Sequence, residues 1–223
     1  MQNRPYEPWT MGLLVRTRLR IFPLLRETWE AFSLLLSFLM NIFYLVRHAH
    51  AEWTLDEQRP LSSRGCEDAS KVMELLCDQP ISGIYSSPYQ RAIQTVLPLA
   101  SKLGLPIQGE PDLRERSLGD APGVKDFYTA VMMTWQDPSF SFPGGETNAM
   151  AQLRGVAIVE RLARRYPGGH VVLSTHGNLL ALVLKHFDAR IDYVFWKELT
   201  MPDIYMLCLS PGEEPAITRL WQQ

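Results

Sequence analysis

Cysteine is scarce in this sequence. Three cysteines, Cys66, Cys77 and Cys208, are spread over 223 residues. Their odd number and wide spacing exclude a disulfide framework and a zinc site built from paired cysteines. Such a composition is typical of proteins in the reducing cytosol, so we expect a cytoplasmic protein.

The sequence also lacks an excess of charge of either sign. It has 22 Lys and Arg residues against 24 Asp and Glu residues, which gives a formal net charge of −2. This balance provides no global field that would attract nucleic acid, so we expect no nucleic-acid partner. Any site for an anion must be built locally. With 46% hydrophobic residues, the chain can bury a substantial core as one globular domain.

A hydrophobic run long enough to cross a membrane is missing too. Residues 31–46 are uncharged and follow several arginines, but an expected strand from Ile42 to Val46 takes up the end of this run. A membrane span needs about 20 apolar residues. The run also lacks the small-residue cleavage pattern of a signal peptide. We expect residues 1–40 to be a dispensable extension before a start at Met40, or a peripheral membrane anchor.

From Asn41 onward, short apolar runs alternate with helical segments. The apolar runs predict strands over residues 42–46, 83–86, 106–109, 170–176, 204–210 and 216–222. Spacing and capping residues predict helices after Ser62 or Ser63, over Tyr89–Leu103 with Ser87 as its cap, and over residues 177–187. This alternation predicts a three-layer α/β/α sandwich with a mostly parallel central sheet over residues 41–223.

The segment at about residues 116–147 differs from the rest. It contains the stretches GDAPG and DPSFSFPGGE, several aromatic residues and a short helical pattern around Val124–Trp135. Loops of this length often form functional lids, so we expect a lid-like insertion.

Polar residues follow three of the expected strands. Arg47 and His48 follow the first strand, Arg91 begins the helix after the second, and His176 ends the strand at 170–176. Open α/β sheets bind ligands at the ends of their strands, so these residues are expected to meet. Arginines and a helix N-terminus favour an anion such as phosphate. His48 and His50 could together bind a metal, but the adjacent Arg47 would repel a cation.

Each of these residues also has a structural interpretation when it is taken alone. Arg91 could be a solvated helix residue, His176 a capping or core histidine, and Glu115, which follows a strand-like stretch, a member of a surface ion pair. The order and wording of the motifs are more specific. LVRHAHAEW, PLSSRG, IYSSPYQRAIQT, LRERSLGD, FPGGET and STHGN resemble the histidine phosphatase superfamily, also called phosphoglycerate mutase-like, over roughly residues 41–223.

The resemblance implies a phosphoglycerate mutase-like fold and assigns roles to individual residues. It implies His48 as the nucleophile, Glu115 as the proton donor, and Arg47, Arg91 and His176 as phosphate-binding residues. We further expect the substrate pocket to be lined by His50, Tyr128, Trp135 and Glu146. Ala49, His50 and Ala51 depart from the glycine, glutamate and serine or threonine that are usual in the family. These departures leave the substrate preference open.

These roles imply a phosphatase that hydrolyses a small phosphomonoester without metal or cofactor. Neutral His48 would form a phosphohistidine, and Glu115 would donate a proton to the leaving oxygen. A protonated His176 would help to bind the phosphate oxygens. Arg114 and Arg116 are expected to point outward.

Between Ser117 and Leu153, Lys125 is the only basic residue against four acidic ones. We therefore expect a neutral or apolar leaving group, rather than one with a second phosphate or a carboxylate. Two alternatives remain: phosphoryl transfer as in cofactor-dependent phosphoglycerate mutases, which uses the same residues, and a non-catalytic protein that binds phosphorylated ligands. The short insertion favours hydrolysis. The oligomeric state is open, and a dimer is compatible with the sequence.

Overall fold

The computed structural model describes residues 40–52, 54, 56, 58–121, 123 and 126–222. Within this part of the chain, a six-stranded sheet has the strand order β3-β2-β4-β1-β5-β6. The strands are β1 (Asn41–Arg47), β2 (Ile81–Ser86), β3 (Ile107–Gly109), β4 (His170–Thr175), β5 (Asp203–Leu209) and β6 (Ala216–Arg219). Strands β3, β2, β4 and β1 are parallel, whereas β5 is antiparallel to both of its neighbours. The predicted mostly parallel sheet is confirmed.

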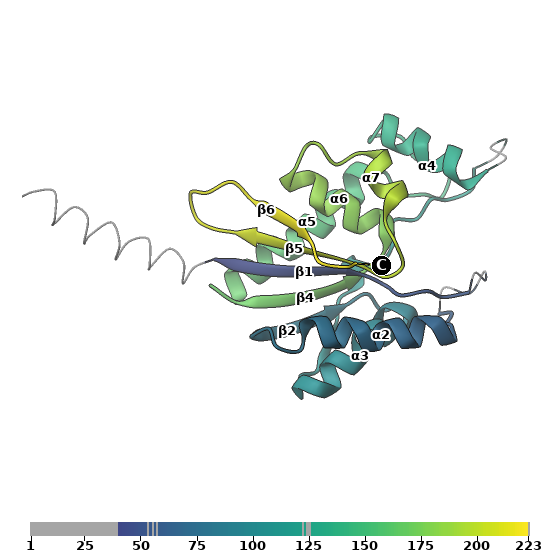
Figure 1. The fold of residues 1–223 in the computed structure, drawn as a ribbon. Helices are drawn as coiled ribbons and strands as arrows, with labels where there is room; N and C mark the ends of the chain where they lie inside the picture. The colour runs from purple at the N-terminus through teal and green to yellow at the C-terminus, as the bar shows by residue number, and fades with distance from the viewer. Residues whose placement is uncertain are drawn as a thin grey trace, which may run out of the picture. The chain divides into compact units, whose positions relative to one another are not determined.

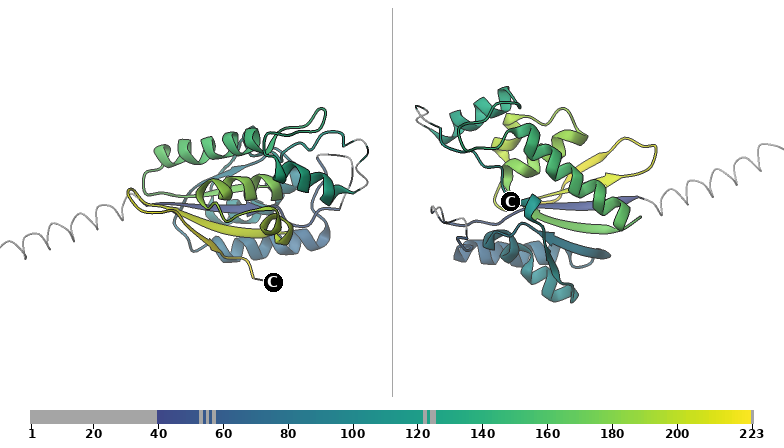
Figure 2. Two further views of the ribbon diagram at one scale, coloured as in Figure 1. Left: turned by 90° about the horizontal axis from the view of Figure 1, so that it is seen from above. Right: turned by 180° about the vertical axis from the view of Figure 1, so that it is seen from behind.

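Helices cover both faces of this sheet (Figure 1). On one face lie α2 (Ser63–Leu76) and α3 (Gln90–Leu103). On the other lie α4 (Phe127–Gln136), α5 (Asn148–Arg165), α6 (Gly177–Phe187) and α7 (Tyr193–Glu198). Seen from behind, the helices form the same two layers (Figure 2). The predicted three-layer sandwich is therefore confirmed.

Strand β1 contributes side chains to two hydrophobic cores, one on each face of the sheet. Phe43 and Leu45 belong to the apolar cluster that includes α5 and α6, whereas Tyr44 and Val46 belong to the cluster with α2 and α3. Alternate side chains of a strand point to opposite faces, and all four are buried. A central strand that is buried on both faces has a continuous apolar sequence, which explains the run before Arg47.

Two boundaries near the end of the sheet differ from the predicted ones. Helix α3 begins after Tyr89, and the predicted cap Ser87 accepts a hydrogen bond from the Tyr89 N–H over 3.3 Å before the helix starts. Strand β4 ends at Thr175, so His176 becomes the residue that precedes α6. In addition, Glu115 follows the 3₁₀ turn η1 (Pro111–Leu113) and not a strand. All three differences lie at or next to residues of the predicted site.

Residues 1–39 lie outside the described residues, so the predicted extension and its membrane association stay predictions. Among the helices that the structure describes, none is long and apolar enough to cross a membrane. The predicted insertion begins directly after Glu115, contains α4 and ends where α5 begins. Its role as a lid also stays a prediction.

Candidate active site

Three of the predicted phosphate-binding and catalytic side chains meet at the carboxyl ends of β1, β2 and β4. Arg91 Nε lies 3.2 Å from His48 Nε2, and Arg91 Nη2 lies 3.3 Å from His176 Nδ1. The two imidazole rings are 5.1 Å apart. All three side chains are buried, with 8% or less of each residue exposed. The strands that position them are neighbours in the sheet, which brings together residues far apart in the sequence.

His48 is held with its Nε2 lone pair facing this cluster. Its Nδ1 lies 2.8 Å from the carbonyl oxygen of Ala49. A carbonyl can only accept, so Nδ1 carries the hydrogen and Nε2 is the unprotonated nitrogen. The pKa of His48 is lowered from 6.5 to about 3, mainly by burial and in part by the positive charges of Arg91, Arg47 and Arg59. His48 is therefore a neutral imidazole at neutral pH, and its Nε2 lone pair accepts a hydrogen bond from Arg91 Nε.

His176 is neutral as well, which corrects the predicted imidazolium. Burial lowers the pKa of His176 well below 6.5, and the neighbouring His48 and Arg91 act in the same direction. Because the Arg91 guanidinium donates to Nδ1, the single ring hydrogen lies on Nε2, 2.8 Å from Ser87 Oγ. This contact also explains the position of Ser87 before α3: it orients His176.

Arg47 lies against the start of α6. Its Nη1 donates to the carbonyl oxygens of Leu199 and Thr200 over 2.7 and 3.2 Å. Its buried Nε has no hydrogen-bond acceptor among the described residues. A Cβ at Gly177 would lie 3.0 Å from both Nε and Cζ of Arg47, so only glycine leaves the guanidinium its place.

Arg59 is a residue that the sequence analysis missed. Its positive charge lowers the pKa of both His48 and His176, so its guanidinium lies near them. Its Nη1 donates to the carbonyl oxygens of Thr54 and Asp56 over 3.2 and 3.3 Å. The Nε is buried and has no acceptor in the part of the chain that the structure describes. The signal was its position directly before the PLSSRG motif, but an arginine in a polar loop is usually a surface residue.

Glu115 contacts the first turn of α6. Its Oε1 accepts from the N–H groups of Leu179 and Arg116 over 3.0 and 2.8 Å, and Oε2 accepts from that of Asn178 over 3.0 Å. A carboxylate has about four acceptor positions, so these bonds leave one open, on Oε2. The negative charge of Glu115 also acts on Arg47. Glu115 therefore lies beside the predicted phosphate-binding residue Arg47 with one open acceptor position.

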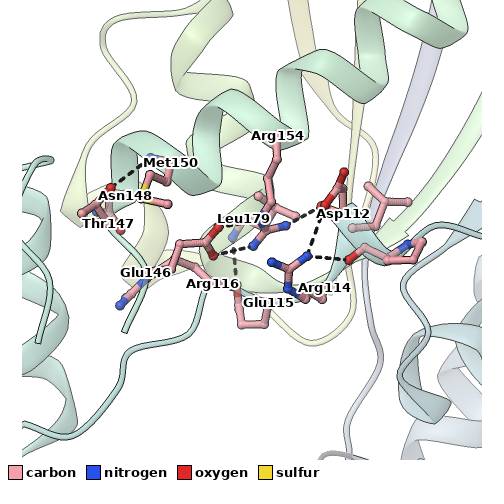
Figure 3. Close-up of polar contacts among 12 residues, drawn as sticks. Asp112, Arg114, Glu115, Arg116, Glu146, Thr147, Asn148, Met150, Arg154 and Leu179 are labelled. Carbon is pink, nitrogen blue, oxygen red and sulfur yellow. Dashed lines mark hydrogen bonds and ion pairs between the residues drawn. The ribbon is translucent and has the colours of Figure 1, made fainter. Parts of the chain in front are cut away.

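Three of the predicted pocket walls use their polar atoms in contacts within the protein. His50 Nδ1 lies 2.8 Å from Ser62 Oγ, at the cap of α2. Trp135 Nε1 donates to Asn178 Oδ1 over 2.9 Å. Both carboxylate oxygens of Glu146 accept from Arg154, over 2.7 and 2.8 Å (Figure 3). A contact of any of them with substrate stays a prediction.

Tyr128 is the fourth predicted wall and the most accessible one. It is 55% exposed and lies in an aromatic cluster with Phe127 and Trp196, with ring centroids 5.8 and 6.1 Å from its own. Tyr128 is also among the groups that raise the pKa of Arg47, a predicted phosphate-binding residue. Its contact with substrate also stays a prediction. No group of three or more His, Cys, Asp or Glu side chains suited to a metal ion occurs in the described ranges.

Arg114 and Arg116 differ from each other. The Arg114 side chain is 43% exposed and pairs with Asp112 over 3.2 Å, in line with the expected outward orientation. Arg116 is only 5% exposed, so its expected outward orientation is wrong. Arg116 is therefore a buried positive charge at the first position of the predicted insertion.

Known proteins are similar to this chain in sequence and in fold. The family model of the histidine phosphatase superfamily (branch 1) matches residues 43–222. Phosphoglycerate mutase-like protein 4 of Arabidopsis thaliana is 29% identical over 61% of this chain and 66% of its own length. The metal-independent phosphoserine phosphatase of the same plant is 28% identical over 62% of this chain and 65% of its own length, so each alignment spans slightly less than two thirds of the relative.

A solved structure supports the fold. Phosphoglycerate mutase from Bacillus anthracis superposes with a TM-score of 0.65 over 81% of this chain and 92% of its own, at 18% identity. This similarity confirms the predicted phosphoglycerate mutase-like fold. The match of the family model over residues 43–222, most of the sequence, shows that the chain belongs to the histidine phosphatase superfamily.

Proposed function

We propose that this protein is a phosphatase that hydrolyses a small phosphomonoester through a phosphohistidine on His48. The observation that carries this proposal is the state of His48: a buried, neutral imidazole whose Nε2 lone pair faces the Arg91 guanidinium. A nucleophile needs a lone pair, and a phosphate needs positive charge around it. Both requirements are met at this one position.

In the first step, His48 Nε2 attacks the phosphorus, and the bond from phosphorus to the ester oxygen breaks. The leaving oxygen takes a proton from Glu115, whose open acceptor position on Oε2 is where that proton is carried. The products of this step are an alcohol and a phosphohistidine. The hydrogen on His48 Nδ1 stays bound to the Ala49 carbonyl throughout.

In the second step, water attacks the phosphorus and the bond to His48 Nε2 breaks. Glu115, now ionised, takes the proton of the water, so inorganic phosphate leaves and both residues return to their starting states. Arg47, Arg59 and Arg91 supply positive charge for the phosphate oxygens. His176, whose single N–H at Nε2 is bonded to Ser87 Oγ, positions Arg91 through its Nδ1, and a phosphate dianion in the pocket would oppose the lowering of the His176 pKa by burial.

Names of relatives give further support for hydrolysis of a small phosphorylated compound. Among the relatives are a metal-independent phosphoserine phosphatase of Arabidopsis thaliana and a glucosyl-3-phosphoglycerate phosphatase of Mycolicibacterium vanbaalenii. The mutase alternative uses the same residues and differs in the acceptor of the phosphoryl group. An experiment that identifies this acceptor therefore distinguishes the phosphatase from the mutase.

The test is hydrolysis of phenyl phosphate in excess EDTA by the wild-type protein, by His48→Ala and by His186→Ala. His186 is an exposed histidine in the last turn of α6 and serves as the matched control. We expect turnover by the wild type and the control, no turnover by His48→Ala, and a phosphorylated His48 in mass spectra of quenched reactions. Loss of activity in EDTA would refute the metal-free mechanism. Transfer to an added alcohol with little release of phosphate would favour the mutase.

A further inference from the structure

The guanidinium of Arg47 is held by a short loop between α7 and β5. Its Nη1 donates to the carbonyl oxygens of Leu199 and Thr200 over 2.7 and 3.2 Å. Both residues belong to the loop 199–202, which joins the two elements. A binding group keeps its geometry only when the contacts behind it are themselves fixed. Whatever fixes this loop therefore also fixes Arg47.

Asp203 fixes the loop from inside the sheet. It is completely buried and lies directly opposite Arg47 in the antiparallel pairing of β1 with β5. Its Oδ2 accepts a hydrogen bond from the Thr200 N–H over 2.9 Å, and its Oδ1 accepts one from the Ile204 N–H over 3.0 Å. The Asp203 carboxylate thus binds the same peptide segment whose carbonyl groups bind Arg47.

Arg219, on the edge strand β6, completes this network. Its Nε donates to Asp203 Oδ1 over 2.9 Å, and its Nη2 donates to Oδ2 over 2.8 Å. The same Nη2 donates to Thr200 Oγ1 over 3.2 Å, because that hydroxyl gives its own hydrogen to the Pro202 carbonyl over 2.6 Å. Two parallel bonds are the strong geometry of an arginine–carboxylate pair. Arg219 therefore holds both the buried carboxylate and the loop.

We propose that Asp203 and Arg219 are positioning residues that orient Arg47 toward phosphate through the loop 199–202. This inference rests on the proposed function, in which Arg47 binds phosphate oxygens. A guanidinium is planar and rigid, so bonds from Nη1 to the loop also set the direction of Nε. That Nε is buried and has no acceptor in the described part of the chain, so an anion can use it.

A direct role in binding does not fit Asp203. A carboxylate beside a phosphate would repel it, and a buried carboxylate without a cation is costly. The bidentate pair with Arg219 removes both difficulties. Asp203 can therefore remain next to the phosphate-binding residue Arg47 and organise its surroundings without opposing the substrate.

The test measures the Kd for inorganic phosphate by titration calorimetry in the wild type, Arg219→Met and Arg161→Met. Arg161 is the matched control: its side chain is 48% exposed, against 42% for Arg219, and it also pairs with an acid from another element, Glu110. Loss of one hydrogen bond to a charged group corresponds to roughly tenfold in an equilibrium constant. We therefore expect the Kd to rise about tenfold in Arg219→Met and to stay at the wild-type value in Arg161→Met.

A second comparison separates positioning from a merely structural role. In the Arg47→Met background, Arg219→Met should leave kcat/KM for phenyl phosphate unchanged, because the guanidinium that the loop orients is gone. In the wild-type background the same substitution should lower kcat/KM about tenfold, as estimated from the lost bond. An equal loss in both backgrounds would overturn the inference, since Arg219 would then act without Arg47.

The two proposals fail separately. An unchanged Kd in Arg219→Met, together with hydrolysis of phenyl phosphate by the wild type, would overturn the positioning role and leave the phosphatase proposal intact. Phosphate binding without hydrolysis of any ester would refute the phosphatase, and a raised Kd in Arg219→Met would still support positioning. No binding of phosphate by the wild type would refute both. If Arg219→Met does not fold, Arg219→Gln loses the charge and one of the parallel bonds, and an unchanged Kd in that variant would overturn the role.

Discussion

Replacing Gly177 by alanine tests how closely Arg47 is positioned. The new Cβ would lie 3.0 Å from Arg47 Cζ and Nε, about 0.4 Å inside the ordinary contact range that begins at 3.4 Å. The guanidinium cannot move freely, because its Nη1 bonds to Leu199 and Thr200 measure 2.7 and 3.2 Å. A displacement of 1 Å at a catalytic group costs about 100-fold in rate, so a shift of roughly 0.4 Å should cost about tenfold.

The assay is kcat/KM for phenyl phosphate, measured together with the melting temperature. Alanine has a higher helix propensity than glycine by up to about 1 kcal/mol, so stability should not fall with activity. Gly109→Ala is the control, since a Cβ at that position would meet nothing within 4 Å. Wild-type activity in Gly177→Ala would contradict the reasoning, and so would an equal loss of activity in Gly109→Ala.

Three further predictions concern stability. Gly65→Ala should lower the free energy of unfolding by about 2 kcal/mol or more in urea titrations, because its Cβ would lie 2.1 Å from the backbone oxygen of His50; wild-type stability would contradict this packing. The pKa of His48 is lowered to about 3 in the folded protein, so the free energy of unfolding should fall as the pH drops from 6.5 toward 3. The slope should be steeper than in His48→Gln by up to about 1.4 kcal/mol per pH unit. Equal slopes would refute the lowered pKa. Arg154→Met removes a largely buried ion pair, whose arginine side chain is 10% exposed, and should cost about 3 kcal/mol. The control Arg161→Met, on the same helix but 48% exposed, should cost less than about 1 kcal/mol, so equal losses would contradict the difference in burial.

The sequence was informative where a pattern follows directly from geometry. The apolar run before Arg47 predicted a strand buried on both faces, and β1 has this environment. The placement of polar residues after three parallel strands predicted that His48, Arg91 and His176 would meet, because parallel strands end at the same edge of a sheet. Helix α5 was not predicted individually, although its buried residues recur at helical spacing.

The failures concern properties that depend on neighbours distant in the sequence. His176 was expected to be charged, but its protonation depends on burial and on guanidinium groups contributed by other elements. Arg116 was expected to point outward together with Arg114, and nothing local in RERS distinguishes the two arginines, yet Arg116 is buried. The positive charge of Arg59, a loop residue, lowers the pKa of both His48 and His176. Each of these properties is decided by the tertiary fold.

The strand order has a consequence for how the site is assembled. The residues proposed to bind phosphate depend on β1, β2 and β4, and β4 lies between the other two in the sheet. His48 and His176 are contributed by segments from opposite halves of the sequence, so no fragment that ends before β4 contains a phosphate pocket. Binding of inorganic phosphate should therefore be coupled to cooperative folding of the whole sheet. A bound phosphate would slow hydrogen exchange in the central strands as well as around the pocket itself.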